Sequence, residues 1–358
     1  MSTPAAAVAA TSHINDYAVR TADIQFDRCR VIEVWRGVVK LQPEAKYEWF
    51  YRRSPHKAPT LLLLTHGQND TCVGVAGLGT REVFLHGVQS TAGILVDLVV
   101  LPDHRTLYPA LLLQKTMQAT ALSLHRIVYG FPNKNSTAIV RRLGYTQVGY
   151  LVRHSKVLRH APYLKRYGIP AWLSKVVGAV ADCVMPLYFR PCRVLRGVWR
   201  VAWASSVDAR FDTLWQRTSG FDGLIGIRDA KFLAWRFFSQ PEHSYRVFVV
   251  STESSAEITA YAICEAIGNS MHVRDFLVDP NCIGGTRLLV HLLSTEAQLQ
   301  GYDNLSLSFA GPECQRKELA SAGLVQRETQ ALYAKFDTLA EVRSAKLEWY
   351  LTNADEDS

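Results

Sequence analysis

The chain has 358 residues, a length that favours two domains of ordinary size. Hydrophobic residues make up 48% and charged residues 20%, close to ordinary globular usage, so each half can bury a core of its own. The seven cysteines form no Cys-x-x-Cys pair. This spacing argues against a zinc site or a disulfide framework and fits a reducing compartment. The start of the chain lacks a basic stretch and is predicted to be a tail, not a signal peptide.

The first half predicts several strands, a helix, a further strand and a second helix, in that order. The third strand-like run is apolar and closes with Pro-Asp, and the stretch after it has apolar residues at helical spacing. The last helical pattern of this half ends at Gly144-Tyr145. The predicted strands cover residues 60–67, 73–87, 94–103 and 126–131, and the first helix covers residues 109–123.

The second half repeats this order of elements. Trp49 and Trp235 each stand six residues before a proline, at the start of the repeated region. The final helical pattern of the second half ends at Gly323-Leu324. The predicted strands cover residues 245–252, 258–267, 271–281 and 305–310, and the helix covers residues 287–300.

Spaced landmarks support an internal repeat. Asp97 precedes Pro102 by five residues, as Asp275 precedes Pro280. From that proline to the glycine at the end of the last helix there are 42 residues in the first half and 43 in the second. We therefore predict two α/β units, each with a mixed sheet and a closing strand.

The basic charge is concentrated in the middle of the chain. Residues 153–200 contain ten Lys or Arg and a single acid, a net charge of +9, so the rest of the chain sums to −1. Within this segment Ala171–Tyr188 is mostly apolar but carries Lys175 and Asp182. We predict an amphipathic helix that packs on a domain. An interfacial helix on anionic lipid or a polyanionic glycan, and a membrane span, stay open. Nucleic acid is not expected, because no nucleic-acid-binding module accompanies the charge.

A motif after the third strand of the first half carries a family resemblance. Residues 100–105 read Val-Leu-Pro-Asp-His-Arg, and Asn133 and Gly144-Tyr145 follow. This order of strand, Pro-Asp-x-Arg, helix, strand, Asn, helix and Gly-Tyr resembles the GNAT (N-acetyltransferase) superfamily. The resemblance implies an α/β fold of two tandem acyl-CoA N-acyltransferase-like domains, each a mixed, mostly antiparallel sheet flanked by helices.

The resemblance also implies an acyl-coenzyme A site in the first half. The family loop reads Gln/Arg-x-x-Gly-x-Gly/Ala, and Arg105 and Ala110 match it, while Tyr108 replaces a glycine. Free N–H groups at a helix start suit a pyrophosphate, although a turn that binds nothing is the alternative. Asn133 matches an asparagine that contacts the coenzyme A arm, with a helix N-cap as its alternative role. The implied cofactor-binding residues are Val99, Val100, Leu101, Arg105, Thr106, Leu107, Tyr108, Pro109, Ala110 and Asn133. The co-substrate would be acetyl-CoA or another acyl-CoA, and no metal is expected.

Asp97 and Tyr145 are the candidate catalytic residues. Asp97 lies on the strand that often supplies a general base in the family. A buried aspartate that ties down a loop is the alternative, and its counterpart Asp275 supports that alternative. The position of the family's usual acid tyrosine is Val140 here, so Tyr145 is only a neighbouring candidate. Positioning of both substrates can support catalysis without that acid.

The second half departs further from the family pattern. Its loop at residues 281–286 reads Asn-Cys-Ile-Gly-Gly-Thr, with no Arg or Gln at the start. Glu313 and Cys314 occupy the region of Asn133, where an acid would repel a phosphate-rich cofactor. We predict that this half completes an acceptor pocket or supports the first half.

These observations combine into one prediction of organisation and function. We expect acyl transfer, acetyl first of all, from coenzyme A to an amine on a small molecule or on a glycan- or lipid-linked acceptor, in the cytoplasm. Two alternatives stay open. One is a catalytically vestigial scaffold that binds a partner, a glycan or the inner face of an anionic membrane through residues 153–200, and the other is transfer of longer acyl chains. The predicted segments are a disordered tail (1–14), a GNAT-like domain with the acyl-CoA site (15–158), a basic aromatic helical linker (159–205), a degenerate GNAT-like domain (206–345) and an acidic tail (346–358).

Overall fold

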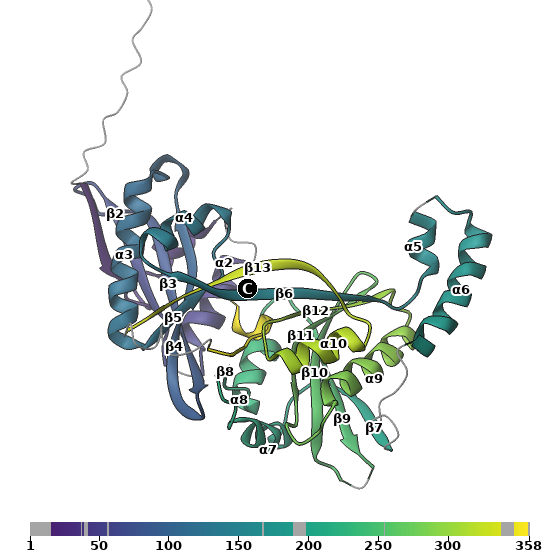
Figure 1. Cartoon of the computed structure of the whole chain (residues 1–358). Coiled ribbons are helices and arrows are strands. Elements are labelled where there is room, and N and C mark those ends of the chain that lie inside the picture. Colours follow the sequence, from purple (N-terminus) through teal and green to yellow (C-terminus); the bar gives the residue numbers. More distant parts are fainter. Residues whose placement is uncertain are drawn as a thin grey trace, which may run out of the picture.

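Figure 1 shows the fold as a computed structural model, in which residues 16–36, 38, 42–55, 57–166, 168–188, 198–253, 255–337 and 347–356 are described. The predicted N-terminal tail lies outside the described residues. The described strands form one 14-stranded sheet that both halves share. The predicted class, a mixed and mostly antiparallel sheet flanked by helices, is confirmed.

The first half follows the predicted order of elements closely. It contains β1 (Tyr17–Thr21), α1 (Arg28–Trp35), α2 (Pro43–Lys46), the π-helix η2 (Tyr47–Arg52), β2 (Thr60–His66), β3 (Thr71–Leu85), β4 (Val88–Val100), the 3₁₀ turn η3 (Pro102–His104), α3 (Leu107–Leu124), β5 (Ile127–Gly130), α4 (Lys134–Arg142) and β6 (Thr146–Val157). A helical hairpin of α5 (Ala161–Arg166) and α6 (Ala171–Tyr188) comes next in the chain.

The second half repeats the plan. It contains β7 (Trp199–Ala204), α7 (Ala209–Thr218), β8 (Leu224–Gly226), α8 (Ala230–Leu233), the π-helix η5 (Ala234–Phe238), β9 (Tyr245–Thr252), β10 (Ile258–Ile267), β11 (Ser270–Val278), α9 (Gly285–Leu299), β12 (Asn304–Phe309), α10 (Glu313–Ser321), β13 (Val325–Phe336), β14 (Trp349–Tyr350) and the 3₁₀ turn η6 (Asn353–Asp355). Gly144 and Gly323, the paired glycines of the repeat, have φ of +78° and +90° just after α4 and α10. They end the two helices in the left-handed conformation that glycine adopts without strain.

Strand β2 shows why this sequence forms a layered structure. Alternate side chains of a strand point to opposite faces of the sheet. Leu61 and Leu63 pack with α1 and η2 on one face, and Leu62 and Leu64 pack with α3 on the other. All four are buried, as expected for a strand covered on both faces.

The two halves exchange their last long strands. The sheet runs β1-β2-β3-β4-β5-β13-β6-β12-β11-β10-β9-β7, so β13 of the second half lies beside β5 of the first. In return β6 of the first half pairs with β12 of the second, and β6 and β13 pair with each other. Figure 1 shows both strands crossing the middle of the molecule. The predicted domain boundary at residue 158 divides the chain between the two repeats, but it does not divide the sheet, because each repeat contributes a strand to the other.

Trp49 and Trp235 meet where the two repeats face each other. The indole N–H of Trp49 donates to the Trp235 carbonyl at 2.9 Å, and the indole N–H of Trp235 donates to the Trp49 carbonyl at 3.1 Å. The rings stack with centroids 5.2 Å apart. Each tryptophan lies in a π-helix, η2 or η5. This reciprocal contact relates the halves as a two-fold axis relates subunits of a dimer.

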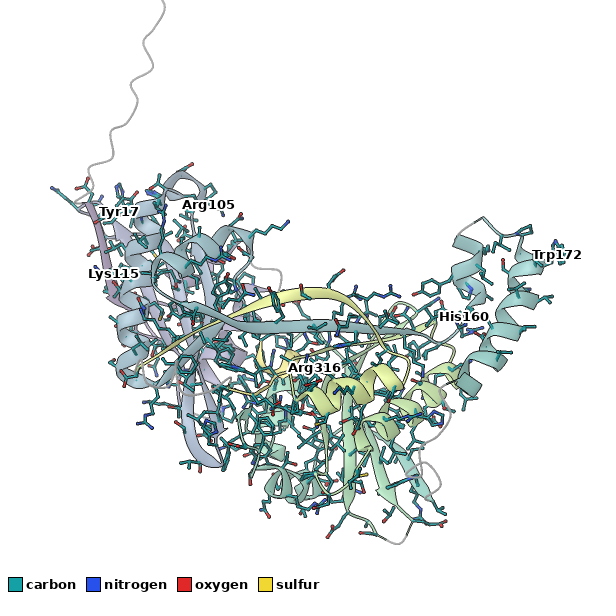
Figure 2. The ribbon with its side chains drawn as sticks, in the orientation of Figure 1. Tyr17, Arg105, Lys115, His160, Trp172 and Arg316 are labelled. Atoms are coloured by element: carbon teal, nitrogen blue, oxygen red, sulfur yellow. The ribbon has the colours of Figure 1, made fainter. Side chains whose placement is uncertain are left out.

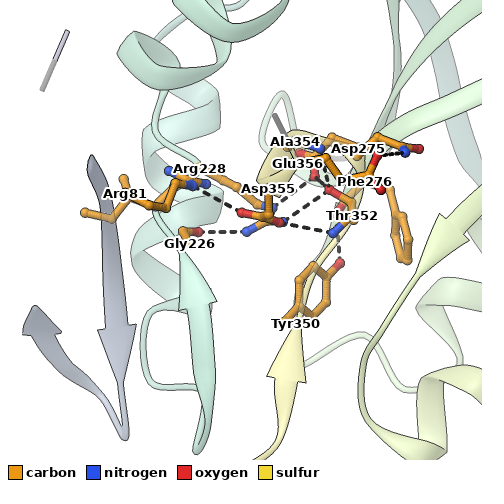
Figure 3. A network of polar contacts seen from close by, with 12 residues as sticks. Arg81, Gly226, Arg228, Asp275, Phe276, Tyr350, Thr352, Ala354, Asp355 and Glu356 are labelled. Carbon is orange, nitrogen blue, oxygen red and sulfur yellow. Dashed lines mark hydrogen bonds and ion pairs between the residues drawn. The ribbon is translucent and has the colours of Figure 1, made fainter. Parts of the chain in front are cut away.

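The C-terminal segment corrects one prediction. Residues 346–358 were expected to form a solvated acidic tail, but residues 349–355 are mostly buried between the halves, and Asp355 is fully buried. Its carboxylate pairs with Arg81 of β3 at 3.1 Å and with Arg228 at 2.5 Å (Figure 3). Arg228 also pairs with Asp275 at 3.0 Å. Two buried cations therefore face two buried anions, which is why the acidic end folds inward.

We expect Asp355→Asn to lower the free energy of unfolding by about 3–5 kcal/mol, because it leaves Arg81 and Arg228 with one carboxylate fewer in a buried site. Urea unfolding at neutral pH measures this loss. Asp337→Asn is the matched control, since Asp337 is exposed. An equal, small effect of both substitutions would contradict the role of the buried network.

Acid should weaken the same network. Burial raises the pKa of the Asp355 carboxyl, but Arg228 and Arg81 outweigh burial and hold the pKa below its ordinary value. The stabilisation is therefore fully present above the ordinary carboxyl pKa of about 3.9 and is lost as pH falls through the lower pKa of the folded state. Unfolding followed from pH 7 downwards should show this loss in the wild type and a smaller loss in Asp355→Asn.

Candidate functional site

A cleft opens between β4 and β5. Residues Ala92–Ile94 of β4 pair in parallel with residues Ile127–Tyr129 of β5, and the two strands separate after these residues. The gap holds a cavity of about 360 Å³. Its lining comes from β4 (Leu95, Val96, Asp97, Leu98), from α3 (Gln114), from the end of β5 and α4 (Gly130, Phe131, Pro132, Asn133, Ser136, Val140) and from β13 (Gln330, Tyr333).

A bulge in β4 accompanies this separation. Val75 pairs with Val99, and Gly77 pairs with Val96, so two residues of β4 stand opposite one residue of β3. Asp97 is one of the two and has a φ of +52°. A bulge bends its strand and increases the local twist. Beyond Ile94, the described β4 pairs with β3 on one side but not with β5 on the other, so its backbone edge faces the cleft.

Asp97 is held by two side chains. Lys46 donates to one carboxylate oxygen at 2.5 Å, and the Tyr51 hydroxyl donates to the other at 2.7 Å. The Asp97 side chain is only 4% exposed. A Cβ at Gly77 would collide with the Tyr51 hydroxyl, so glycine is needed there. Because both oxygens are engaged, the geometry favours an aspartate that ties down the β4 bulge, and the role of general base stays a prediction.

Asp275 of the second half is held in the same manner. Its carboxylate accepts from Arg228 at 3.0 Å, from Thr352 at 2.6 Å and from Tyr261 at 2.7 Å. The aspartate five residues before the proline is thus a buried acceptor in both halves. The repeated spacing has a structural cause that does not depend on catalysis.

Tyr145 lies away from the cleft. It is 4% exposed, packs in the core beneath α3 and α4, and does not line the cavity. Its hydroxyl has no hydrogen-bond partner among the described residues, and burial raises its pKa above the ordinary value. This placement disfavours an acid for the leaving thiol. The phenol that does line the cleft is Tyr333 of β13, whose oxygen accepts from Arg141 at 2.8 Å.

The predicted loop forms the end of β4 and the start of α3. The helix begins at Leu107, after Thr106, and the Thr106 side chain makes no capping bond to the first turn. Arg105 donates to the Val100 carbonyl at 2.8 Å, which holds its guanidinium at the strand end. The Tyr108 ring packs edge-on against Tyr17, with ring centroids 6.3 Å apart. Residues 99–101 and 105–110 flank the cleft but do not line the cavity itself.

Asn133 has the capping role that was its alternative. Its side-chain oxygen accepts from the N–H groups of Asn135 and Ser136 at 2.9 and 3.0 Å, and α4 begins at the next residue. Asn133 also lines the cleft, and it is exposed there. Of the predicted site residues, the structure brings Asp97 and Asn133 into the cavity lining.

The chain itself fills part of the corresponding region of the second half. At the start of α9, Glu318 accepts from the backbone N–H of Arg287 at 3.2 Å, so a carboxylate stands where a phosphate would bind. Near the ends of β11 and β12, Leu351 bridges to Ala310, and the Tyr350 hydroxyl donates to the Phe276 carbonyl. A cavity of about 580 Å³ remains beside the start of α9, and Glu318, which accepts from the Arg287 N–H, is part of its lining. This arrangement favours a degenerate second half.

Several lining residues were not predicted. Gln330 and Tyr333 belong to β13, which chain order assigns to the second half and strand exchange brings to the first. Gln114 and Ser136 face the cleft from α3 and α4, and the helical spacing of their neighbours is the signal that could have found them. Within the described ranges, no three His, Cys, Asp or Glu residues are grouped as a metal site would require.

We expect Asp97→Asn to lower the free energy of unfolding by about 3–5 kcal/mol, because the buried Lys46 ammonium loses its counter-charge. The double variant Lys46→Met/Asp97→Asn should recover part of this loss, since it removes the unpaired charge. A double-mutant cycle by urea unfolding measures the coupling. Unchanged stability of Asp97→Asn, together with a large loss of turnover, would instead support the general base.

Solved structures share the fold of this chain, although comparisons of its sequence found no match. No protein-family model matches the sequence, and no curated protein matches it. A conserved protein of unknown function from Enterococcus faecalis, described as a probable N-acyltransferase, is 12% identical over 89% of this chain and 72% of its own, with a TM-score of 0.63. A GCN5-related N-acetyltransferase from Anabaena variabilis is 10% identical over 91% and 74%, with a TM-score of 0.62. Saccharomyces cerevisiae N-myristoyltransferase with bound myristoyl-CoA is 11% identical over 90% and 83%, with a TM-score of 0.53. The chain therefore shares the fold of these solved N-acyltransferases and builds it from two repeated halves.

Proposed function

We propose that this protein transfers an acyl group from acyl-coenzyme A to an amine in the cleft between β4 and β5. The observation that carries the proposal is the separation of these two strands after Ile94, next to the start of α3. The solved relatives include N-acetyltransferases and an N-myristoyltransferase bound to myristoyl-CoA, which supports acyl-coenzyme A as the donor class.

The cleft offers the contacts that this donor needs. The backbone edge of β4 beyond Ile94 can pair with the amides of the pantetheine arm, as an added strand would. Leu95, Phe131 and Val140 give the lining an apolar part for the acyl chain. The first turn of α3 presents N–H groups and the positive end of the helix dipole to the phosphates.

Positioning carries the chemistry in this proposal. The unprotonated amine attacks the thioester carbonyl, a C–N bond forms and the C–S bond breaks. The amine loses its proton to water, and the thiolate leaves and is protonated by water. Asp97 acts as a positioning residue, since it holds the β4 bulge through Lys46 and Tyr51. Holding two reactants in line can supply a large part of the barrier reduction without a dedicated acid.

An acetyl donor is the finer part of the proposal. A cavity of about 360 Å³ lies at the small end of the range for ligand pockets. Acetyl-CoA should therefore support turnover with amines better than a long-chain acyl-CoA does. A comparison of kcat/KM for donors of increasing chain length measures this preference, and higher values for long chains would make the long-chain transferase the better account.

Acetyl-CoA and free coenzyme A should bind the wild type saturably in calorimetric titration, and Ala110→Glu should weaken binding at least about tenfold, or 1.4 kcal/mol. A carboxylate in the first turn of α3 repels phosphates, yet it suits the helix dipole, so the fold should persist. Ala119→Glu is the matched control, because Ala119 is exposed in the middle of the same helix. No binding by folded wild type would favour the vestigial scaffold.

The exchanged strand provides a second test of the same site. Gln330→Trp should fill the cleft from β13 and weaken acyl-CoA binding at least about tenfold, with little change in stability, because Gln330 is exposed at the cavity lining. Gln326→Trp changes an exposed residue of the same strand outside the lining and should bind as the wild type does. Equal affinities of the two variants would place the donor elsewhere.

A further inference from the structure

The α5–α6 hairpin projects from the body of the molecule between β6 and β7 (Figure 1). The outer face of α6 is apolar. Trp172 is 70% exposed, and Val176 and Val180 are each 58% exposed. These residues recur every four positions and so form one stripe along the helix. Val184 continues the stripe and Val177 lies beside it, both exposed, while Lys175 is the one polar side chain among the residues of α6 described as exposed.

The inner face of α6 is small and polar. The Ser174 hydroxyl is hydrogen-bonded to the carbonyls of Ile169 and Pro170, both at 2.9 Å. Gly178 lies against Ala161 of α5, where a Cβ would approach the Ala161 backbone to 2.6 Å. A helix that only had to remain in water would turn its apolar side inward and its polar side outward. The polarity of α6 is inverted, which indicates that something apolar covers the outer face.

The only acid of the basic segment is turned inward. Asp182 accepts from the backbone N–H of His160 at 2.9 Å and lies 2.6 Å from the His160 ring nitrogen. Figure 2 places His160 near the base of the hairpin and Trp172 on its outer side. Lys165 and Lys175 are exposed on the hairpin, and the apolar stripe belongs to a stretch of sequence, residues 153–200, with a net charge of +9.

The basic charge of this segment distinguishes between two apolar partners, a second copy of the chain and a lipid bilayer. Two copies of the chain that met through α6 would bring two such basic segments together and would repel each other. An anionic bilayer attracts basic residues near its surface and accepts an apolar stripe at the boundary between headgroups and acyl chains. A tryptophan suits the level of the headgroups. In the part of the chain that the structure describes, no helix is long and apolar enough to span a bilayer, so the contact is with its surface.

We propose that the α5–α6 hairpin binds the surface of an anionic lipid bilayer, with Trp172, Val176 and Val180 entering the headgroup boundary and with Lys165 and Lys175 facing the lipid phosphates. The proposal goes beyond the proposed acyl transfer and does not depend on it. Burial of large apolar side chains away from water is favourable, so the stripe can supply a substantial part of the affinity.

The full chain should co-sediment with vesicles of phosphatidylcholine and phosphatidylglycerol, and far less with vesicles of phosphatidylcholine alone. High salt should weaken this binding, because the attraction of basic residues to lipid phosphates is screened. The double variant Val176→Glu/Val180→Glu should lose at least about tenfold in vesicle affinity. Val88→Glu is the matched control, since Val88 is 69% exposed on the β3–β4 turn. All substituted residues are exposed, so thermal unfolding of the variants should match the wild type.

Three outcomes would overturn the proposal. One is the absence of vesicle binding by folded wild type. Another is concentration-dependent dimerisation in light scattering that Val176→Glu/Val180→Glu abolishes, without any vesicle binding, which would assign the stripe to a second copy. The third is vesicle binding that salt abolishes but the valine substitutions leave unchanged, since that would reduce the contact to charge alone. Titration of the same variants with acyl-CoA distinguishes the two proposals. The valine substitutions should leave acyl-CoA binding unchanged, whether or not the hairpin binds vesicles.

Discussion

The pairing of each short inner strand with the closing strand of the other half is the constraint on which this structure depends. All four residues of β5 are buried, so an unpaired edge of this strand would leave buried backbone groups without hydrogen bonds. β13 supplies that edge in the first half, and β6 supplies it for β12 in the second. The exchange joins the two halves into one sheet and brings Gln330 and Tyr333 to the cleft. It also directs β6 out of the first half and towards the hairpin.

Buried charges stabilise the centre of this arrangement. Each half has an aspartate in the strand that precedes its long helix, β4 or β11, and each aspartate accepts from a cation and a hydroxyl group. Asp97 accepts from Lys46 and Tyr51. Asp275 accepts from Arg228 and Tyr261. Isolated buried charges cost several kcal/mol, so these side chains persist only because they are paired and hydrogen-bonded. In the second half the pairing extends to Asp355 and so holds the C-terminal segment.

The same pairing makes the two halves structurally unequal. The C-terminal segment contacts the ends of β11 and β12, and Glu318 caps the start of α9. The first half has no such filling among the described residues, and its strand edge and helix start stay accessible. The β4–β5 cleft of the first half is thus open, while the chain fills part of the corresponding region of the second half. Trp49 and Trp235 still show the two-fold relation of the fold.

The sequence by itself determined the order of strands and helices, the repeat and the class of the fold, because apolar periodicity, Pro-Asp closures and helix-ending glycines are local signals. It also located the basic segment and the helix at Ala171–Tyr188. Only the tertiary structure decided that β13 pairs with β5, because strand pairing is a non-local choice. Likewise, burial of Asp355 depends on cations 127 and 274 residues away, and the engagement of Asp97 depends on a lysine 51 residues away. The outward apolar face of α6 depends on Ala161 and His160 taking its inner side, a contact that no periodicity within the helix reveals.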